Sequence, residues 1–395
     1  TLVTMPPPQS DSFRHNSFFW KLFGIWPGRT PNKYYKYFSF TYLITTLVAY
    51  NALLTLNLYY TPRKIDLFIH EVIFYFTEIA VTTKVSMILF KRKQIVDIFD
   101  LLDCEEFKGS HDTGRKIVEE HNSNFKIYYK YLSILCNFTF LSQVIYPVIG
   151  MLIFKTTLDL PICKYYFLSE ETIDNYFTLI FLYQSFGIYG HMMYNVNIDT
   201  LIVGFMVLAI AQIKVLSHDL ENLKIEKTDT GREESDQKQL QKLYKCVKHY
   251  ALVLKYCADF QQIISATMFV QYGVGAACIC VAMSALLLPL KVETFIFMVG
   301  YFFVISLQLF VPAFLGTHLL YESQELMVAA YKSDWIPRSR SYRQSIKLFV
   351  ERAKHPVVIT GLKIFPLSLA TYISIMKTAY SCFTLVRFMQ DREEH

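Results

Sequence analysis

Seven stretches of the chain are apolar over roughly the 20 residues that a helix needs to cross the hydrocarbon core of a bilayer. They are 38–58, 67–90, 131–154, 176–194, 263–290, 292–315 and 364–387. Asn195, Asn197 and Asp199 follow the fourth stretch, and the apolar piece beyond them is only about 13 residues long, which is short for another span. The pattern predicts an all-α membrane protein with seven transmembrane helices, the fourth continuing out of the membrane.

The segments on one side of these spans are long and also helical in pattern. An apolar stripe runs through Ile213, Leu216 and Leu220 at helical spacing. Residues 316–363 contain two further amphipathic helices, each stopped by a proline. We therefore expect the fourth, fifth and sixth helices to extend into a cytosolic anchor made of 213–262 and 316–363.

The rest of the chain divides around these elements. Residues 1–35 form a cytosolic N-terminus whose stretch "SFFWKLFGIWPG" suits a short helix lying in the membrane interface. Residues 36–315 hold the first six spans. Residues 364–395 form the seventh helix and a short extracellular tail.

Basic residues indicate the orientation. The segments up to 36, 91–130, 214–248 and 332–354 contain 28 Lys and Arg, and the segments on the other side contain seven. Because Lys and Arg concentrate on the cytoplasmic side, the N-terminus is predicted inside and the C-terminus outside. The formal net charge of +6 then reflects membrane topology, not a nucleic-acid surface.

The last span has a polar face. Thr371, Ser374, Thr378 and Ser381 recur at steps of three and four residues in "ATYISIMKTAYSCFTLVRFMQ". A helix that lines an aqueous path offers hydroxyls on one face and apolar groups on the other. Helix packing through small polar residues would produce the same stripe, so the pattern leaves both interpretations open.

Two acids fall within the second span. Intramembrane carboxylates are costly and commonly functional. Glu71 is expected near the outer interface, and Glu78 is expected to pair with Lys84 or with Lys377.

No enzyme class is indicated, because the chain contains no nucleophile elbow, P-loop, HExxH or metal-ligand spacing. No cofactor is predicted. A seven-helix receptor of the G-protein-coupled type would need an external N-terminus, which the basic residues oppose. A secondary transporter would show two related halves, and the sequence shows none. These two classes remain the alternatives to a channel.

The C-terminal region resembles a known family. "QLFVPAFLGTHLLYESQELMVAAYKSDW", residues 308–335, followed by "RAKHPVVITGLKIFPLSLATYISIMKTAYSCFTLVRF", is similar to the C-terminal signature of insect odorant receptors. The matching positions are Gly316, Leu319, Glu322, Ser323, Leu326, Ala330, Tyr331 and Trp335.

This resemblance implies an odorant-binding subunit of a ligand-gated, non-selective cation channel. Such subunits form tetramers with a shared co-receptor in the plasma membrane of olfactory neuron dendrites. Two departures place this chain among the odorant-tuned subunits. Ser381-Cys382 and Phe388 stand where the co-receptor has Thr-Tyr and Gln, and Glu226–Asp236 is far shorter than the co-receptor's second intracellular loop.

The resemblance also implies site residues. A small volatile is expected in the outer half of the bundle, between helices two, three, four and six. The residues offered there are Phe74, Tyr75, Thr77, Ser142, Tyr146, Phe181, Gln184, Ile188, Tyr272, Met298, Tyr301 and Phe302. The pore and hydrophobic gate are expected at Thr378, Ser381, Leu385, Phe388 and Met389.

Overall fold

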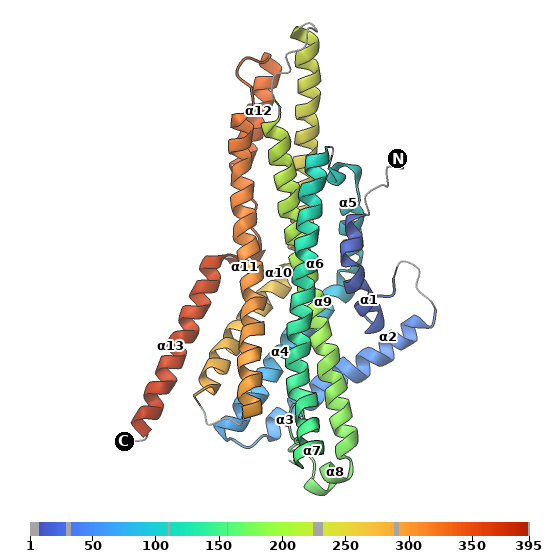
Figure 1. The fold of residues 1–395 in the computed structure, drawn as a ribbon, viewed down its shortest axis with the longest axis vertical. Helices are drawn as coiled ribbons and strands as arrows, with labels where there is room; N and C mark the ends of the chain where they lie inside the picture. The colour runs from blue at the N-terminus through green and yellow to red at the C-terminus, as the bar shows by residue number, and fades with distance from the viewer. Residues whose placement is uncertain are drawn as a thin grey trace.

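A computed structural model describes residues 8–28, 33–109, 111–155, 157–223, 232–287 and 292–393. This part of the chain is a bundle of long helices with a two-stranded antiparallel sheet, β1 (Thr360–Gly361) and β2 (Phe365–Pro366). The C-terminal helix α13 stands beside the bundle, and its free end lies at the pole opposite to α12 (Figure 1).

Six helices in the described residues are long and apolar enough to cross a membrane: Tyr35–Tyr60, Glu71–Phe90, Asp112–Phe154, Phe177–Glu221, Gln237–Ala285 and Phe295–Lys332. The helix α13 (Leu369–Glu393) supplies a seventh of sufficient length. Each predicted stretch corresponds to one of these seven helices, although 288–290 at the end of the fifth lie outside the described residues. The seventh is predicted to begin at 364, whereas α13 begins at Leu369, because Phe365 and Pro366 belong to β2.

The long helices have these bounds. The first span joins α2 (Tyr35–Leu43), η2 (Ile44–Val48) and α3 (Ala49–Tyr60), and the third joins α6 (Asp112–Phe140), η4 (Leu141–Ile145) and α7 (Tyr146–Phe154). The others are α4 (Ile65–Phe90), α9 (Phe177–Glu221), α10 (Arg232–Ala285) and α11 (Val292–Lys332). The shorter elements are η1 (Gln9–Phe13), α1 (Arg14–Leu22), α5 (Arg92–Leu102), η3 (Glu105–Lys108), α8 (Glu170–Asn175) and α12 (Arg340–Ala353).

Three helices are far longer than a bilayer is thick. The helices α9, α10 and α11 contain 45, 54 and 41 residues. At 1.5 Å per residue the longest measures about 80 Å, against about 30 Å for the hydrocarbon core. Their ends gather with α12 at one pole, away from the C-terminus (Figure 1). These projecting ends form the anchor that the sequence predicts.

The helix α9 forms the centre of the bundle and is uninterrupted, as the sequence predicts. Almost every side chain from 201 to 211 is buried, which explains why this stretch is apolar on all sides. It packs against α1, α4, α6, α10 and α11. Gly204 allows the Phe13 ring to lie directly on the α9 backbone, since a Cβ at Gly204 would come within 2.4 Å of that ring.

The N-terminal segment is part of this core. Phe13 and Trp20 are almost completely buried. Asn16 Nδ2 donates to Asn197 O and to Thr200 Oγ1, at 2.7 Å each. Phe13 and Trp20 therefore pack on protein, whereas Phe18 on α1 is exposed, and the interfacial position expected for this helix stays a prediction.

Candidate functional site

A cavity of about 140 Å³ lies among α4, α6, α9, α10 and α11. A space of about 150 Å³ is enough for a molecule the size of benzene. The apolar part of the lining comprises Phe74, Leu132, Cys136, Phe140, Ile188, Met192, Val196, Val274, Cys278, Phe297, Val304 and Ile305. The cavity therefore suits a small, largely apolar molecule that loses its hydration on entry.

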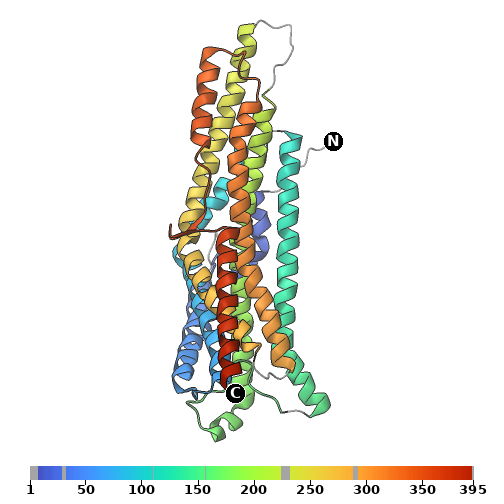
Figure 2. The same ribbon diagram turned by 90° about the vertical axis from the view of Figure 1, so that its left-hand side faces the viewer.

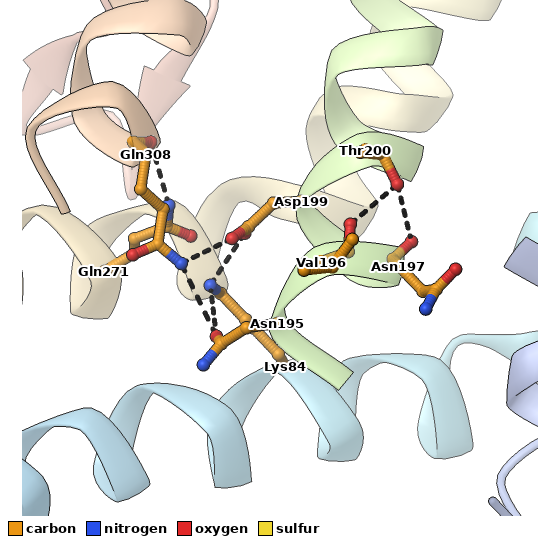
Figure 3. Close-up of polar contacts among 8 residues, drawn as sticks. All are labelled: Lys84, Asn195, Val196, Asn197, Asp199, Thr200, Gln271 and Gln308. Carbon is orange, nitrogen blue, oxygen red and sulfur yellow. Dashed lines mark hydrogen bonds and ion pairs between the residues drawn. The ribbon is translucent and has the colours of Figure 1, made fainter. Parts of the chain in front are cut away.

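One side of the cavity is lined by Asn195, Asp199 and Gln308, which surround a buried ion pair between Asp199 and Lys84 (Figure 3). Lys84 Nζ on α4 lies 2.7 Å from Asp199 Oδ1 on α9. The same ammonium donates to Asn195 Oδ1 at 2.8 Å, and Gln308 Nε2 on α11 donates to Asp199 Oδ2. Because Lys84 is fully buried, this pairing is what makes its charge tolerable inside the bundle.

A second buried pair lines the cavity nearby. Glu78 Oε2 lies 2.6 Å from His191 Nδ1, and His191 Nε2 lies 2.9 Å from Thr46 O. A carbonyl only accepts, so Nε2 carries a hydrogen, and Nδ1 faces the carboxylate. The prediction that Glu78 pairs with Lys84 or Lys377 is wrong, because Lys84 is held by Asp199. The partner of Glu78 is His191 on α9 and not Lys84.

A hydroxyl chain crosses the cavity between α4 and α11. Thr77 Oγ1 donates to Ile73 O at 2.8 Å. The Tyr301 hydroxyl lies 2.7 Å from Thr77 Oγ1, which has spent its hydrogen on Ile73, so Tyr301 donates to Thr77. What this pair still offers to a ligand is acceptor lone pairs.

Four of the twelve residues that the sequence analysis names for the ligand line the cavity: Phe74, Thr77, Ile188 and Tyr301. They come from α4, α9 and α11, and the structure brings them together around one space.

The other eight lie outside the cavity lining. Gln184 is buried but forms hydrogen bonds with the connection between α7 and α8. It accepts from Ile162 N at 3.1 Å and donates to Cys163 O at 2.9 Å. The Tyr272 hydroxyl donates to Leu309 O and joins α10 to α11. Tyr146 is 56% exposed. The remaining five are Tyr75, Ser142, Phe181, Met298 and Phe302.

The polar lining was missed by sequence reasoning. His191, Gln143, Asn195, Asp199, Gln271 and Gln308 all line the cavity. The available signal was Asn195 and Asp199, polar residues four apart at the end of an apolar stretch. Sequence reasoning interpreted these two residues as the end of a span. In the structure they lie on one face of α9 and turn toward Lys84 (Figure 3).

The predicted pore residues lie on a helix at the edge of the subunit. The helix α13 packs against α10 and α11, with Ala379 fully buried at that contact. Thr378 and Ser381 are exposed, and their hydroxyls donate to carbonyls of α13 itself. Leu385 and Phe388 are more than half exposed. The Met389 side chain lies outside the described residues.

The linker that leads into α13 is bound to both α10 and α11. Gln261 on α10 donates to Thr360 O at 2.7 Å and accepts from Thr360 N at 2.9 Å. Ser265 accepts from Leu362 N, and Thr317 on α11 accepts from Leu369 N, at 2.9 Å each. The start of α13 is therefore tied to both α10 and α11.

Together, the fold and the cavity define a multi-pass α-helical membrane protein with a ligand-sized space among its helices. The family model described as 7tm Odorant receptor matches residues 64–380, which is most of the chain. The chain belongs to the insect odorant receptor family. Its all-α membrane fold with seven transmembrane helices is thereby confirmed, and the N-terminus inside with the C-terminus outside stays a prediction.

Individual relatives agree with this assignment. Odorant receptor 98a of Drosophila melanogaster is 31% identical over 167 residues, and the match spans 42% of each chain. Odorant receptor 85a of the same species is 25% identical over 395 residues, 95% of this chain and 91% of the relative. By contrast, the matches to the first three relatives span only about half of the length of each relative or less.

A solved structure shares the fold. The insect olfactory receptor OR5 from Machilis hrabei, in complex with eugenol, superposes with a TM-score of 0.83 over 96% of this chain and 98% of its own. Its sequence is 16% identical, so this likeness bears on the fold.

Proposed function

We propose that this chain is the odorant-binding subunit of a ligand-gated, non-selective cation channel in the plasma membrane, assembling with co-receptor subunits into a tetramer. The observation that carries the proposal is the cavity, which has the size and the mostly apolar lining that a small volatile requires. Family membership and the eugenol complex of the structural relative support it.

Ligand binding can reach α13 through α10 and α11. Gln271 on α10 lines the cavity and donates to Gln308 O on α11 at 3.1 Å, and Tyr272 donates to Leu309 O beside it. Gln261 and Ser265, about two to three helical turns along α10, hold the linker to α13. We infer that a ligand which alters the spacing of α10 and α11 displaces this linker.

The outward face of α13 then forms the conduction path. Thr378 and Ser381 would offer hydroxyls to water where several copies of α13 surround a common axis. Leu385, Phe388 and Met389 follow toward the outer end, where an apolar constriction can close the path by excluding water. The exposure of Thr378, Ser381, Leu385 and Phe388 in the single subunit supports this arrangement.

The proposal is tested by expressing the chain with a co-receptor and recording membrane current while a panel of volatiles is applied. We expect a volatile to evoke a current that is carried by several monovalent cations and is absent with the co-receptor alone. Uptake of a solute without channel-like current would contradict the proposal and favour a transporter.

A second measurement separates the channel from a receptor that couples to a G protein. Epitope tags at the two termini are labelled in intact cells. The proposal expects labelling at the C-terminus only, and an externally labelled N-terminus would overturn it.

A further inference from the structure

The amide of Asn195 is fixed in one orientation. Its oxygen accepts from Lys84 Nζ at 2.8 Å and from Gln308 Nε2 at 3.5 Å. An ammonium is only a donor, so the oxygen and not the nitrogen must face it. Figure 3 shows the Asn195 nitrogen on the opposite side from these partners.

Asn195 is partly exposed and lines the cavity, so its nitrogen is the atom that it can offer to a ligand. Among the amide nitrogens of the described lining, the other three have acceptors. Gln143 donates to Pro161 O, Gln271 to Gln308 O, and Gln308 to Asp199. Within the described residues the Asn195 nitrogen has no acceptor, so both of its hydrogens are available, whereas Gln143 and Gln271 each keep only one.

The hydroxyls of the lining do not replace this donor. The Tyr301 hydroxyl donates to Thr77 Oγ1, and Thr77 donates to Ile73 O. Thr139 donates to Cys136 O. Tyr128 also lines the cavity, but its O–H rotates and can either donate or accept, so it favours no chemical class.

Each acid of the cavity lining has a basic partner. Asp199 pairs with Lys84, and Glu78 Oε2 lies 2.6 Å from His191 Nδ1. A charged ligand would enter a site of low polarity without a counter-ion, which is strongly unfavourable. The ligand must therefore be neutral.

We propose that Asn195 is a specificity-determining residue whose Nδ2 donates a hydrogen bond to the ligand, and that the preferred ligands are small neutral volatiles with a carbonyl oxygen, such as aldehydes, ketones and esters. This inference rests on the proposed function, because it uses the same cavity. The apolar walls hold the hydrocarbon part, and Asn195 selects the carbonyl at the polar side.

The first experiment needs only the wild-type chain expressed with its co-receptor. Benzaldehyde is compared with styrene, and acetophenone with α-methylstyrene, pairs in which C=O is replaced by C=CH₂ at nearly constant shape. One neutral hydrogen bond is worth about 0.5–1.5 kcal/mol, so the carbonyl compounds should be more potent by roughly 2- to 13-fold. Equal potency within both pairs, or silence of carbonyl compounds while other volatiles evoke current, overturns the inference.

The second experiment compares variants. In Asn195→Leu the potency ratio within each pair should fall to about one. Asn137→Leu is the matched control, since Asn137 is an intramembrane asparagine outside the cavity lining that bonds its own helix at Ser133 O. It should keep the wild-type ratio. A purely structural role for Asn195 would lower the potency of both members equally and leave the ratio unchanged, which contradicts the inference.

Two further outcomes are informative. If Tyr128→Phe abolishes the carbonyl preference while Asn195→Leu retains it, the donor is Tyr128 and the assignment to Asn195 is overturned. If no volatile of any class evokes current although the complex reaches the cell surface, the proposed function itself fails. That result is distinct from equal potency within the pairs.

Discussion

Lys84 illustrates how a single side chain can constrain the bundle. Its ammonium is completely buried and is neutralised by Asp199 on a different helix. Removing one member of a buried pair leaves the other charge without compensation, which typically costs about 3–5 kcal/mol, whereas removing both is far less harmful.

We therefore expect Lys84→Met to reduce surface expression and the melting temperature of the detergent-solubilised complex. Adding Asp199→Leu should restore a large part of both, because the orphaned carboxylate is removed as well. Lys126→Met, at an exposed lysine of α6, is the control and should have no effect. Equal losses in the single and the double variant would show that the ion pair is not the cause.

His249 is a buried group in the cytosolic anchor, ahead of the membrane-crossing part of α10 that begins near residue 263. It stacks near Phe107 and lies 2.9 Å from Gln212 Oε1. Burial lowers the pKa of His249 to about 4, while Glu106 nearby opposes the shift. The ordinary histidine pKa is about 6.5, so the unfolded chain binds a proton between pH 6.5 and 4 that the folded chain does not.

Stability should therefore fall as the pH drops through this window, by about 3 kcal/mol at most from this group. His249→Gln keeps a donor for Gln212 but does not titrate, so its stability should fall less between pH 7 and pH 4.5. Melting temperatures of the two purified proteins across this range provide the comparison. Parallel curves would show that His249 has an ordinary pKa.

At the level of whole elements, the crossing of the α13 linker over α11 depends on Gly316. A Cβ at this position would lie 2.0 Å from Leu367 O, and Leu369 N bonds Thr317 directly beside it. The linker carbonyl can approach the helix only because no side chain stands there.

Gly316→Ala should push the linker off α11 and reduce the volatile-evoked current per receptor at the surface. Gly273→Ala is a matched control in α10, since nothing lies within 4 Å of its added Cβ. Because alanine favours helix by about 0.5–1 kcal/mol over glycine, the control should be at least as stable as the wild type. Normal gating in Gly316→Ala would remove the linker from the coupling route.

The sequence predicted the elements well and the site only in part. Length and apolarity are properties of each segment alone, so the seven spans could be recognised. The partners of Asp199 come from α4 and α11, and no local pattern specifies which helices meet. With 33 Phe and 28 Tyr in the chain, composition could not separate the Phe74 that lines the cavity from the Phe302 that does not.

The whole subunit is asymmetric in a way that indicates assembly. The helix α13 stands to one side of the bundle in Figure 1 and lies in front of it in Figure 2, and among the described residues it packs chiefly against α10 and α11. Its outward face mixes hydroxyls with large apolar groups such as Tyr380 and Leu385. A surface of this kind suits contact with further subunits and with water between them.

If that face lines a conduction path, Ser381→Cys should react with a water-soluble thiol reagent applied outside during stimulation, and the evoked current should change. Ala379→Cys places a thiol on the opposite, buried face and should be unreactive. The wild type, which retains Cys382, controls for native thiols. Reaction of Ala379→Cys with protection of Ser381→Cys would reverse the assigned orientation of the helix.

The contact between α1 and α9 has a consequence for biosynthesis. Asn16 is translated 181 residues before its partner Asn197. At about 5–20 residues per second, roughly 10–35 s pass before α9 has been made. During that interval Phe13 and Trp20 have no α9 to pack against, so the nascent receptor exposes an aggregation-prone N-terminal segment. We expect a chaperone to cover this segment until the fourth span has been inserted.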